Sequence, residues 1–316
     1  MPTLLSLESL EADRRFVEEQ LARDKADRWG TTRLMWENRL ADINEQIDSI
    51  KRSTSSHASV ALVFDGLPVI GSHDIRLDFA ADILDSYQKI ISTMLASNNA
   101  LPILKSGPVR GAQASQLFIR DIVRGSFGFV LEELVPNQSS FVSSNLKNAV
   151  ESATRLIEEL SGTAEDEFES ALNAAPPRLI SAIQKFAKVL ATANASTKII
   201  GDENQIGLSG EVVDRLNSRL NDIKVTDNTD WIDGILLGIL PESHEFELKL
   251  GELGEILKGS VSDELVLKYT TDAIFKDQLL LKPVRAKVQK ITTSRKGKPI
   301  KELNTLESVE PTLVDE

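Results

Sequence analysis

Two runs of aliphatic residues at alternating three- and four-residue steps dominate the first 52 residues. The first run comprises Leu7, Leu10, Val17 and Leu21, with Arg14 in one slot, and the second comprises Leu40, Ile43, Ile47 and Ile50. Charges of both signs fill the positions between them. This spacing is typical of helices that pack along a coiled-coil seam.

The two runs are out of phase with one another. Leu21 and Leu40 are 19 residues apart, and at roughly 100° per residue one straight helix would place them about 100° out of line. The segment Trp29-Gly30-Thr31-Thr32 suits a helix end followed by an N-cap. We therefore predict that residues 1–52 form an antiparallel helical hairpin, called the arm below. The arm either packs on its own domain or mediates self-association or docking to a partner protein.

Residues 57–221 predict a central α+β domain. The apolar run 60–64 is followed by Asp65-Gly66, a strong hairpin signal, with 68–70 as the return strand. Segments 117–123 and 127–131 predict a second hairpin around Arg124-Gly125. Helical periodicity covers 79–95, 146–160, 179–190 and 209–221, with a shorter helix between the second and third of these. These elements predict a small antiparallel sheet with helices on one side.

Residues 222–311 predict a β-rich module, followed by a tail at 312–316. Strand patterns at 232–240, 245–250 and 254–261 precede a helix at 262–276, and two further strands follow at 283–292 and 300–309. This order resembles an OB-fold, a five-stranded barrel with its helix between the third and fourth strands. An SH3-like barrel or an open sheet would give a similar pattern. The fold class predicted for the whole chain is α+β.

One basic segment stands out in a chain whose net charge is −12. An acidic protein repels phosphate backbones overall, yet residues 278–301 contain no acidic residue. The cations of this segment are Lys282, Arg285, Lys287, Lys290, Arg295, Lys296, Lys298 and Lys301. If four or five of them each neutralised one phosphate, log affinity would fall with log salt at a slope of about −4. We predict a nucleic-acid contact here, although the segment lacks an aromatic residue. The alternatives are a solvated hairpin and one that docks on an acidic surface of the same protein.

Asp233, Glu247 and Lys249 suggest an alternative, catalytic function. An aspartate on one strand and Glu-x-Lys on the next is the skeleton of a PD-(D/E)xK nuclease, in which carboxylates hold a divalent metal. The proline that precedes the aspartate in this motif is replaced by Ile232. The alternation of strand 245–250 also sends Glu247 and Lys249 to solvent for structural reasons.

Several other classes of site are not expected from the sequence. The chain has no cysteine, which removes disulfides and thiolate-bound metals. Its three histidines, His57, His73 and His244, are scattered, and no nucleotide-binding fingerprint occurs. We expect no metal and no cofactor. The N-terminus does not look like a signal peptide and no stretch is long enough to span a membrane, so we expect a cytoplasmic location.

The features together favour a non-enzymatic interaction or adaptor protein. Its arm would form a homo-oligomer or dock a partner, and its basic hairpin would contact nucleic acid or an acidic protein. A bacterial multi-protein system, regulatory or active in phage defence, would suit such a chain. The alternative is a metal-dependent nuclease of the PD-(D/E)xK type.

Overall fold

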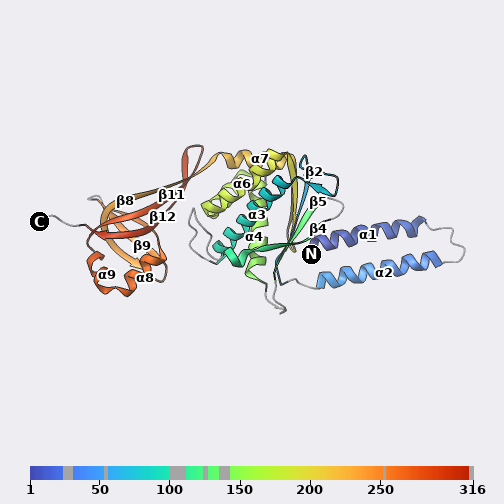
Figure 1. Cartoon of the computed structure of the whole chain (residues 1–316), viewed down its shortest axis with the longest axis horizontal. Coiled ribbons are helices and arrows are strands. Elements are labelled where there is room, and N and C mark those ends of the chain that lie inside the picture. Colours follow the sequence, from blue (N-terminus) through green and yellow to red (C-terminus); the bar gives the residue numbers. More distant parts are fainter. Residues whose placement is uncertain are drawn as a thin grey trace. The chain divides into compact units, whose positions relative to one another are not determined.

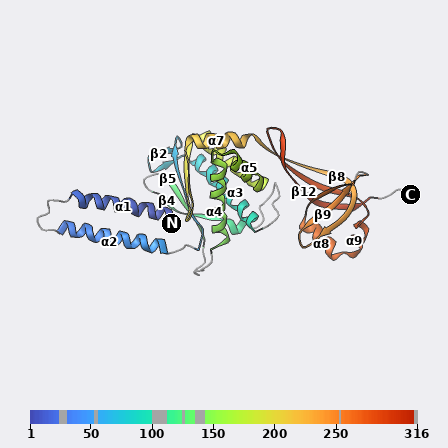
Figure 2. The ribbon, with the colours of Figure 1, turned by 180° about the vertical axis from the view of Figure 1, so that it is seen from behind.

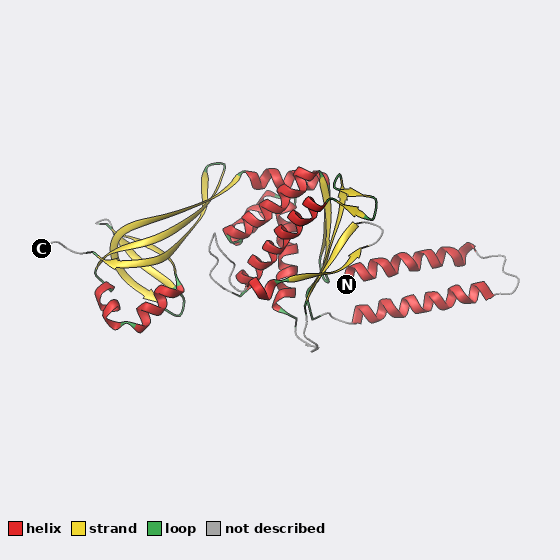
Figure 3. Cartoon of the chain, viewed as in Figure 1, coloured by secondary structure: helices red, strands yellow, loops and turns green. Residues whose placement is uncertain are grey.

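The computed structural model describes residues 1–23, 31–52, 56–99, 112–123, 127–134, 143–251 and 254–312 (Figure 1). The chain divides into two compact units, Met1–Leu220 and Asn221–Glu316. Both units mix helices and strands, so the fold is α+β as predicted (Figure 3). None of the helices in the described ranges combines the length and the apolar composition needed to cross a bilayer.

The N-terminal arm is a pair of helices, α1 (Thr3–Arg23) and α2 (Thr31–Arg52), that lie side by side (Figures 1 and 2). Val17, Ile43 and Ile47 are buried between them. Four other seam residues, Leu7, Leu10, Leu21 and Leu40, are partly buried around this centre, as is Trp36. The predicted helical hairpin is confirmed. Trp29 and Gly30, where the break was predicted, lie outside the described residues.

The central sheet has five antiparallel strands in the order β4-β5-β1-β6-β7. Their bounds are β1 Ser59–Gly66, β4 Leu117–Val123, β5 Phe127–Glu133, β6 Ala195–Ile200 and β7 Gln205–Leu208. The β4–β5 pairing confirms the predicted second hairpin, whose tip at Arg124-Gly125 is outside the described residues. β1 pairs with β5 on one side and with β6 on the other. The strand that opens the domain is therefore its central strand.

Helices cover one face of this sheet (Figures 1 and 2). They are α3 Leu77–Asn98, α4 Asn145–Ser161, α5 Glu165–Ala174, α6 Pro177–Ala193 and α7 Gly210–Asn221, with the short 3-10 helix η1 at Ala112–Ser115. Phe64 of β1 and Phe79 of α3 pack edge to face, with ring centroids 5.4 Å apart. Tyr87 of α3 and Phe186 of α6 lie 6.1 Å apart between the helices. The predicted sheet with helices is confirmed.

The prediction that residues 68–70 return alongside strand 60–64 as a hairpin is wrong. β2 (Val69–Ile70) pairs with β3 (Asp74–Ile75) and not with β1. Gly66 has φ +106°, and a Cβ there would lie 2.4 Å from the carbonyl oxygen of Asn194. The glycine is needed because the α6–β6 connection approaches it closely. The sequence pattern also missed β6 and β7, which complete the sheet.

The first turns of α1 cover part of the other sheet face. Leu5 packs with Ala61, Val130 and Ile200 in a small apolar cluster. The backbone N–H and the hydroxyl of Thr3 both donate to Asp202 Oδ1, at 2.8 and 2.9 Å. The root of the arm, meaning the first turns of α1 around Thr3 and Leu5, therefore packs on the central sheet. Packing of the arm on its own domain was one of the two arrangements predicted from the sequence.

A network of buried charges lies directly behind this contact. The Lys147 ammonium of α4 lies 3.6 Å from Asp202 Oδ2 and 3.5 Å from Glu203 Oε1. Glu151, one turn further along α4, accepts from the backbone N–H of Asp202 at 3.0 Å and from the amide of Asn204 at 2.8 Å. The side chains of Lys147 and Asp202 are only 3% and 4% exposed. Buried charges require such partners, so this network ties α4, the β6–β7 turn and α1 together.

The second unit is a closed five-stranded barrel in the order β10-β12-β11-β8-β9. Its elements are β8 Ile223–Leu240, β9 Glu245–Leu250, β10 Glu255–Val261, α8 Asp263–Thr271, α9 Ala273–Leu279, β11 Pro283–Arg295 and β12 Lys298–Pro311. Leu236, Phe246, Leu248, Val284 and Leu306 belong to its core. The small barrel is confirmed.

Two details of the barrel differ from the prediction. β8 begins nine residues earlier than the predicted start at Ile232, because its polar first half pairs with the second half of β11. The predicted helix 262–276 is two helices, since the Asp272 side chain accepts from the backbone N–H of Phe275 and starts α9. Ser262 caps α8 as an acceptor for Leu265 N–H.

Candidate functional site

The basic segment follows β11 and the start of β12 on the barrel. β11 pairs with β8 in an unbroken antiparallel register from Pro283 to Arg295. Successive strand residues point to opposite faces, but the buried positions of β11 change from even to odd numbers between Val288 and Gln289. Arg285 and Lys287 therefore lie on one face, and Lys290, although exposed, lies on the other. Val284, Ala286 and Val288 fill the core, which places Arg285 and Lys287 on the outer surface. The run of cations in the sequence is therefore divided between two faces of the sheet.

Several of these cations already have partners in the chain. Lys287 pairs with Glu307 at 2.9 Å, Lys290 with Glu302 at 2.9 Å, and Lys296 with Asp222 at 3.8 Å. Arg295 and Lys301 also interact with other groups of the protein. Partial burial lowers the pKa of the Lys301 ammonium. The positive potential of the segment is thus weaker than its sequence suggests.

Lys282, Arg285 and Lys298 have no ion pair with any described carboxylate. The Arg285 guanidinium lies over the indole ring of Trp231, 5.5 Å from its centroid. Its direct cross-strand neighbours are Asp233 on β8 and Glu310 on β12. The site therefore combines a cation, an aromatic ring and nearby carboxylates on one outer face.

Trp231 is the residue that sequence reasoning missed. It lies 54 positions before Arg285 in the chain, yet it is the direct cross-strand partner of Lys287. Its side chain is 42% exposed on the outer face of β8, where an indole ring is accessible for stacking with a ligand. The sequence prediction began this strand at Ile232 and so left Trp231 out of the sheet, whereas β8 begins at Ile223. The basic segment thus gains the aromatic partner that its own sequence lacks.

The alternative nuclease residues are placed apart along the barrel. Asp233 faces Arg285 across β8 and β11. Glu247 lies opposite Gly238, five residues along β8, or roughly 16 Å from Asp233 at about 3.3 Å per residue. The Glu247 carboxylate pairs with Lys258 at 2.6 Å, and Lys249 lies opposite Ile235. In the described part of the chain, no three histidine or acidic side chains form a group that could hold a metal ion.

The arm presents a second exposed surface. Phe16, Leu34 and Met35 are 55%, 58% and 55% exposed. Phe16 packs edge to face on Trp36, with centroids 6.1 Å apart. Exposed apolar side chains of this size are the kind that a contact with another protein would bury.

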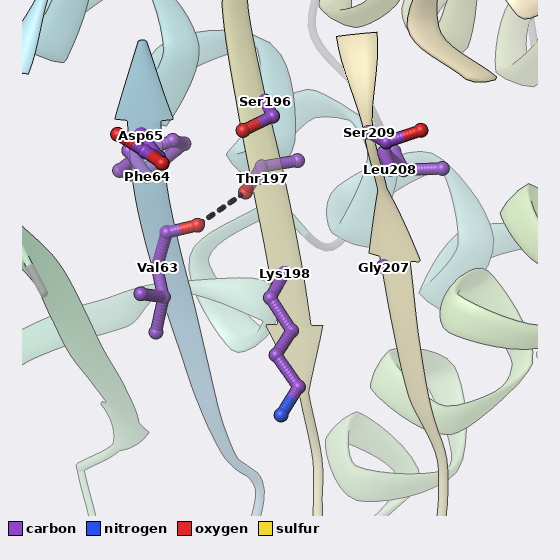
Figure 4. A pocket seen from close by; sticks show the side chains of 9 residues that line it. All are labelled: Val63, Phe64, Asp65, Ser196, Thr197, Lys198, Gly207, Leu208 and Ser209. Carbon is purple, nitrogen blue, oxygen red and sulfur yellow. Dashed lines mark hydrogen bonds between the residues drawn. The ribbon is translucent and has the colours of Figure 1, made fainter. Parts of the chain in front are cut away.

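An open groove of about 300 Å³ crosses β1, β6 and β7 on the central sheet (Figure 4). Val63, Ser196, Lys198 and Gly207 are among its lining residues. Two of its polar groups are already engaged, because Thr197 Oγ1 donates to the Val63 carbonyl at 3.0 Å and Lys198 pairs with Glu8 of α1. The groove therefore offers no arrangement that points to catalysis.

Comparison with known proteins yields no relative: no family model matches the chain, and no curated protein or solved structure is significantly similar to it.

Proposed function

We propose that the chain is a non-enzymatic interaction protein that binds nucleic acid through the outer face of its barrel and other protein chains through its arm. The observation that carries the first part is the exposed Trp231 ring beneath the Arg285 guanidinium, 5.5 Å from centroid to guanidinium carbon. Nucleic-acid binders that read no sequence combine aromatic rings, on which bases stack, with cations that follow the backbone.

The barrel architecture supports this proposal. Its helices α8 and α9 lie between the third and fourth strands, and β10 and β12 close it by parallel pairing of Ser260–Val261 with Thr305–Leu306. This order suits an OB-like assignment, a fold that often binds oligonucleotides. Fold alone does not define function, so the proposal depends on Trp231 and Arg285 rather than on the likeness.

The test compares two charge reversals of equal size on the same barrel. One variant carries Lys282→Glu and Arg285→Glu at the start of β11, and the matched control carries Lys296→Glu and Lys298→Glu at the hairpin tip. Binding of labelled oligonucleotides is followed by fluorescence anisotropy at low and moderate salt. We expect the first variant to lose binding and the control to keep most of it. Loss in the control alone would move the interface to the tip, and binding by both variants would refute a role for the basic segment.

The exposed apolar surface at Phe16, Leu34 and Met35 supports the second part of the proposal. Removing residues 1–52 would uncover the sheet, since Leu5 packs on Ala61, Val130 and Ile200. The sharper variant keeps the root and replaces all three exposed residues by serine, with Arg15→Ser and Glu19→Ser as a control on the exposed side of α1. We expect light scattering to show an oligomer that only the triple variant dissociates. A monomeric mass for the unaltered chain would leave partner docking as the role of the arm.

A further inference from the structure

We propose that the ligand of the barrel is a single-stranded nucleic acid, held by base stacking on Trp231 more than by charge. This inference rests on the proposed function of the barrel face and adds the class of ligand. The inference compares two contributions to binding at this surface: the cations that can contact phosphates and the aromatic ring on which a base can stack.

The electrostatic contribution of this surface is small. Arg285 lies over the Trp231 ring, whereas Lys282, level with Leu236 on β8, is roughly 16 Å further along the strand at about 3.3 Å per residue. Neither has a carboxylate partner among the described residues. Lys287 is paired with Glu307 at 2.9 Å. Lys298 is the cross-strand partner of Arg295, roughly 33 Å along β11 from Arg285 at about 3.3 Å per residue. Two phosphate contacts are therefore the realistic number at this site.

Two contacts are too few to hold a duplex. A duplex hides its bases in the stack and presents mainly phosphates to the outer face of a barrel, and most of its non-specific affinity comes from counterion release at those phosphates. Single strands can place unpaired bases on an aromatic ring, which raises affinity by about 5- to 150-fold per base. The balance of these terms favours a single strand at Trp231.

The same face suggests how the strand would lie. Ile235 is 37% exposed, and its direct cross-strand partner is Pro283. These two residues form a second apolar patch on the outer face, roughly 13 Å along β8 from Trp231. Asp233 lies between Ile235 and Trp231 on β8, so its charge would keep phosphates on the β11 side, near Arg285 and Lys282.

The experiment uses the full chain with Trp29→Phe and Trp36→Phe, which leaves Trp231 as the only indole. A short oligothymidylate and a duplex of equal length are titrated while Trp231 fluorescence is recorded. We expect the single strand to quench the fluorescence and to bind at least tenfold more tightly than the duplex. The slope of log affinity against log salt should be about −1.4, from two contacts at about −0.7 each.

Three variants locate the site. Trp231→Ala should weaken binding of the single strand at least fivefold, Asp233→Asn should strengthen it, and Lys298→Ala should leave it unchanged. Since Trp231 is on the surface, unchanged circular dichroism is expected for each. Equal or tighter duplex binding, lost with the Lys282 and Arg285 reversals, would overturn the single-strand inference and leave the proposed function standing. Binding of neither nucleic acid would overturn both, and single-strand binding that ignores Trp231→Ala would overturn the stacking site.

Discussion

Lysine–carboxylate pairs occur in both units of the molecule, but in opposite environments. In the central unit, Lys147 and Asp202 are 3.6 Å apart with side chains 3% and 4% exposed. In the barrel, Lys287 and Glu307 are closer, at 2.9 Å, but 40% and 34% exposed. Solvent screens the exposed pair, whereas the buried charges have lost their hydration and depend on each other. Environment, and not distance, should therefore decide what each pair contributes.

The largest expected effect follows from removing the buried cation. Lys147→Met leaves Asp202 and Glu203 without their ammonium partner, and breaking a buried pair in this way costs about 3–5 kcal/mol. Urea denaturation of the full chain, followed by a probe of the central unit, would measure the change. Lys287→Met on the barrel is the matched control and should cost less than about 1 kcal/mol. Equal changes in the free energy of unfolding for the two substitutions would show that burial does not determine how much an ion pair contributes to stability.

The second expected effect concerns the root of the arm. Asp202→Asn removes the charge that accepts two hydrogen bonds from Thr3 and that pairs with the buried Lys147 ammonium. Breaking a buried pair costs about 3–5 kcal/mol, and Glu203 remains as a partner of Lys147, which places the expected loss at the lower end of that range. We also expect faster hydrogen exchange in the first turns of α1. Exchange in the distal half of α1, around Val17, should change less. Unchanged exchange at the root would mean that Leu5 alone holds the arm on the sheet.

The sequence predicted those parts of the fold that depend on local patterns. The seam at Leu40–Ile50 predicted α2, and the alternation of Glu245–Leu250 predicted β9, because period and burial coincide in these segments. Strand pairing over long separations was less visible. β6 and β7 are short, and the polar half of β8 has no apolar alternation to reveal it.

The candidate site was only half visible for the same reason. The cations of residues 282–301 form one cluster in the sequence, but strand alternation and pairing with Glu302 and Glu307 divide and neutralise it. Trp231 joins the cluster only through the β8–β11 register. Charges that are close in the sequence can point to opposite faces of a β-sheet, and residues far apart in the sequence can be neighbours on adjacent strands. The arm shows the same limit, since its helices were predicted but the exposed position of Phe16 was not.

A third prediction uses the exposed pair of the barrel to sharpen the comparison. Glu307→Gln should change the free energy of unfolding by less than about 1 kcal/mol, because the pair with Lys287 is solvated. The substitution frees the Lys287 ammonium beside Trp231, so single-strand affinity should rise and the salt slope should steepen by about 0.7. Anisotropy titrations at several salt concentrations would measure both. A stability loss as large as that of Lys147→Met would contradict the assignment of this pair to the surface.

The smallest expected effect comes from an exposed pair inside the central unit itself. Asp85 of α3 accepts hydrogen bonds from Lys185 of α6 at 2.7 Å and from Lys89 at 2.8 Å, and these bonds lower the pKa of its carboxyl group below 3.8. A lowered pKa in the folded state stabilises the fold above the unfolded pKa, and this contribution disappears as the pH falls through the folded value. Asp85→Asn should therefore lower the Tm slightly at neutral pH, and the difference from the unaltered chain should shrink as the pH falls below the ordinary aspartate pKa and through the lowered folded-state pKa.

Since the Asp85 side chain is 48% exposed, its contribution should stay below about 1 kcal/mol although it lies in the same unit as Lys147. Thermal unfolding of both chains between neutral and acidic pH would measure it, with Asp82→Asn as a control on the same helix. A difference that persists at low pH would show that Asp85 acts through packing. A Tm loss comparable to that of Lys147→Met would show that membership of the central unit, and not burial of the pair, sets the contribution of a charge.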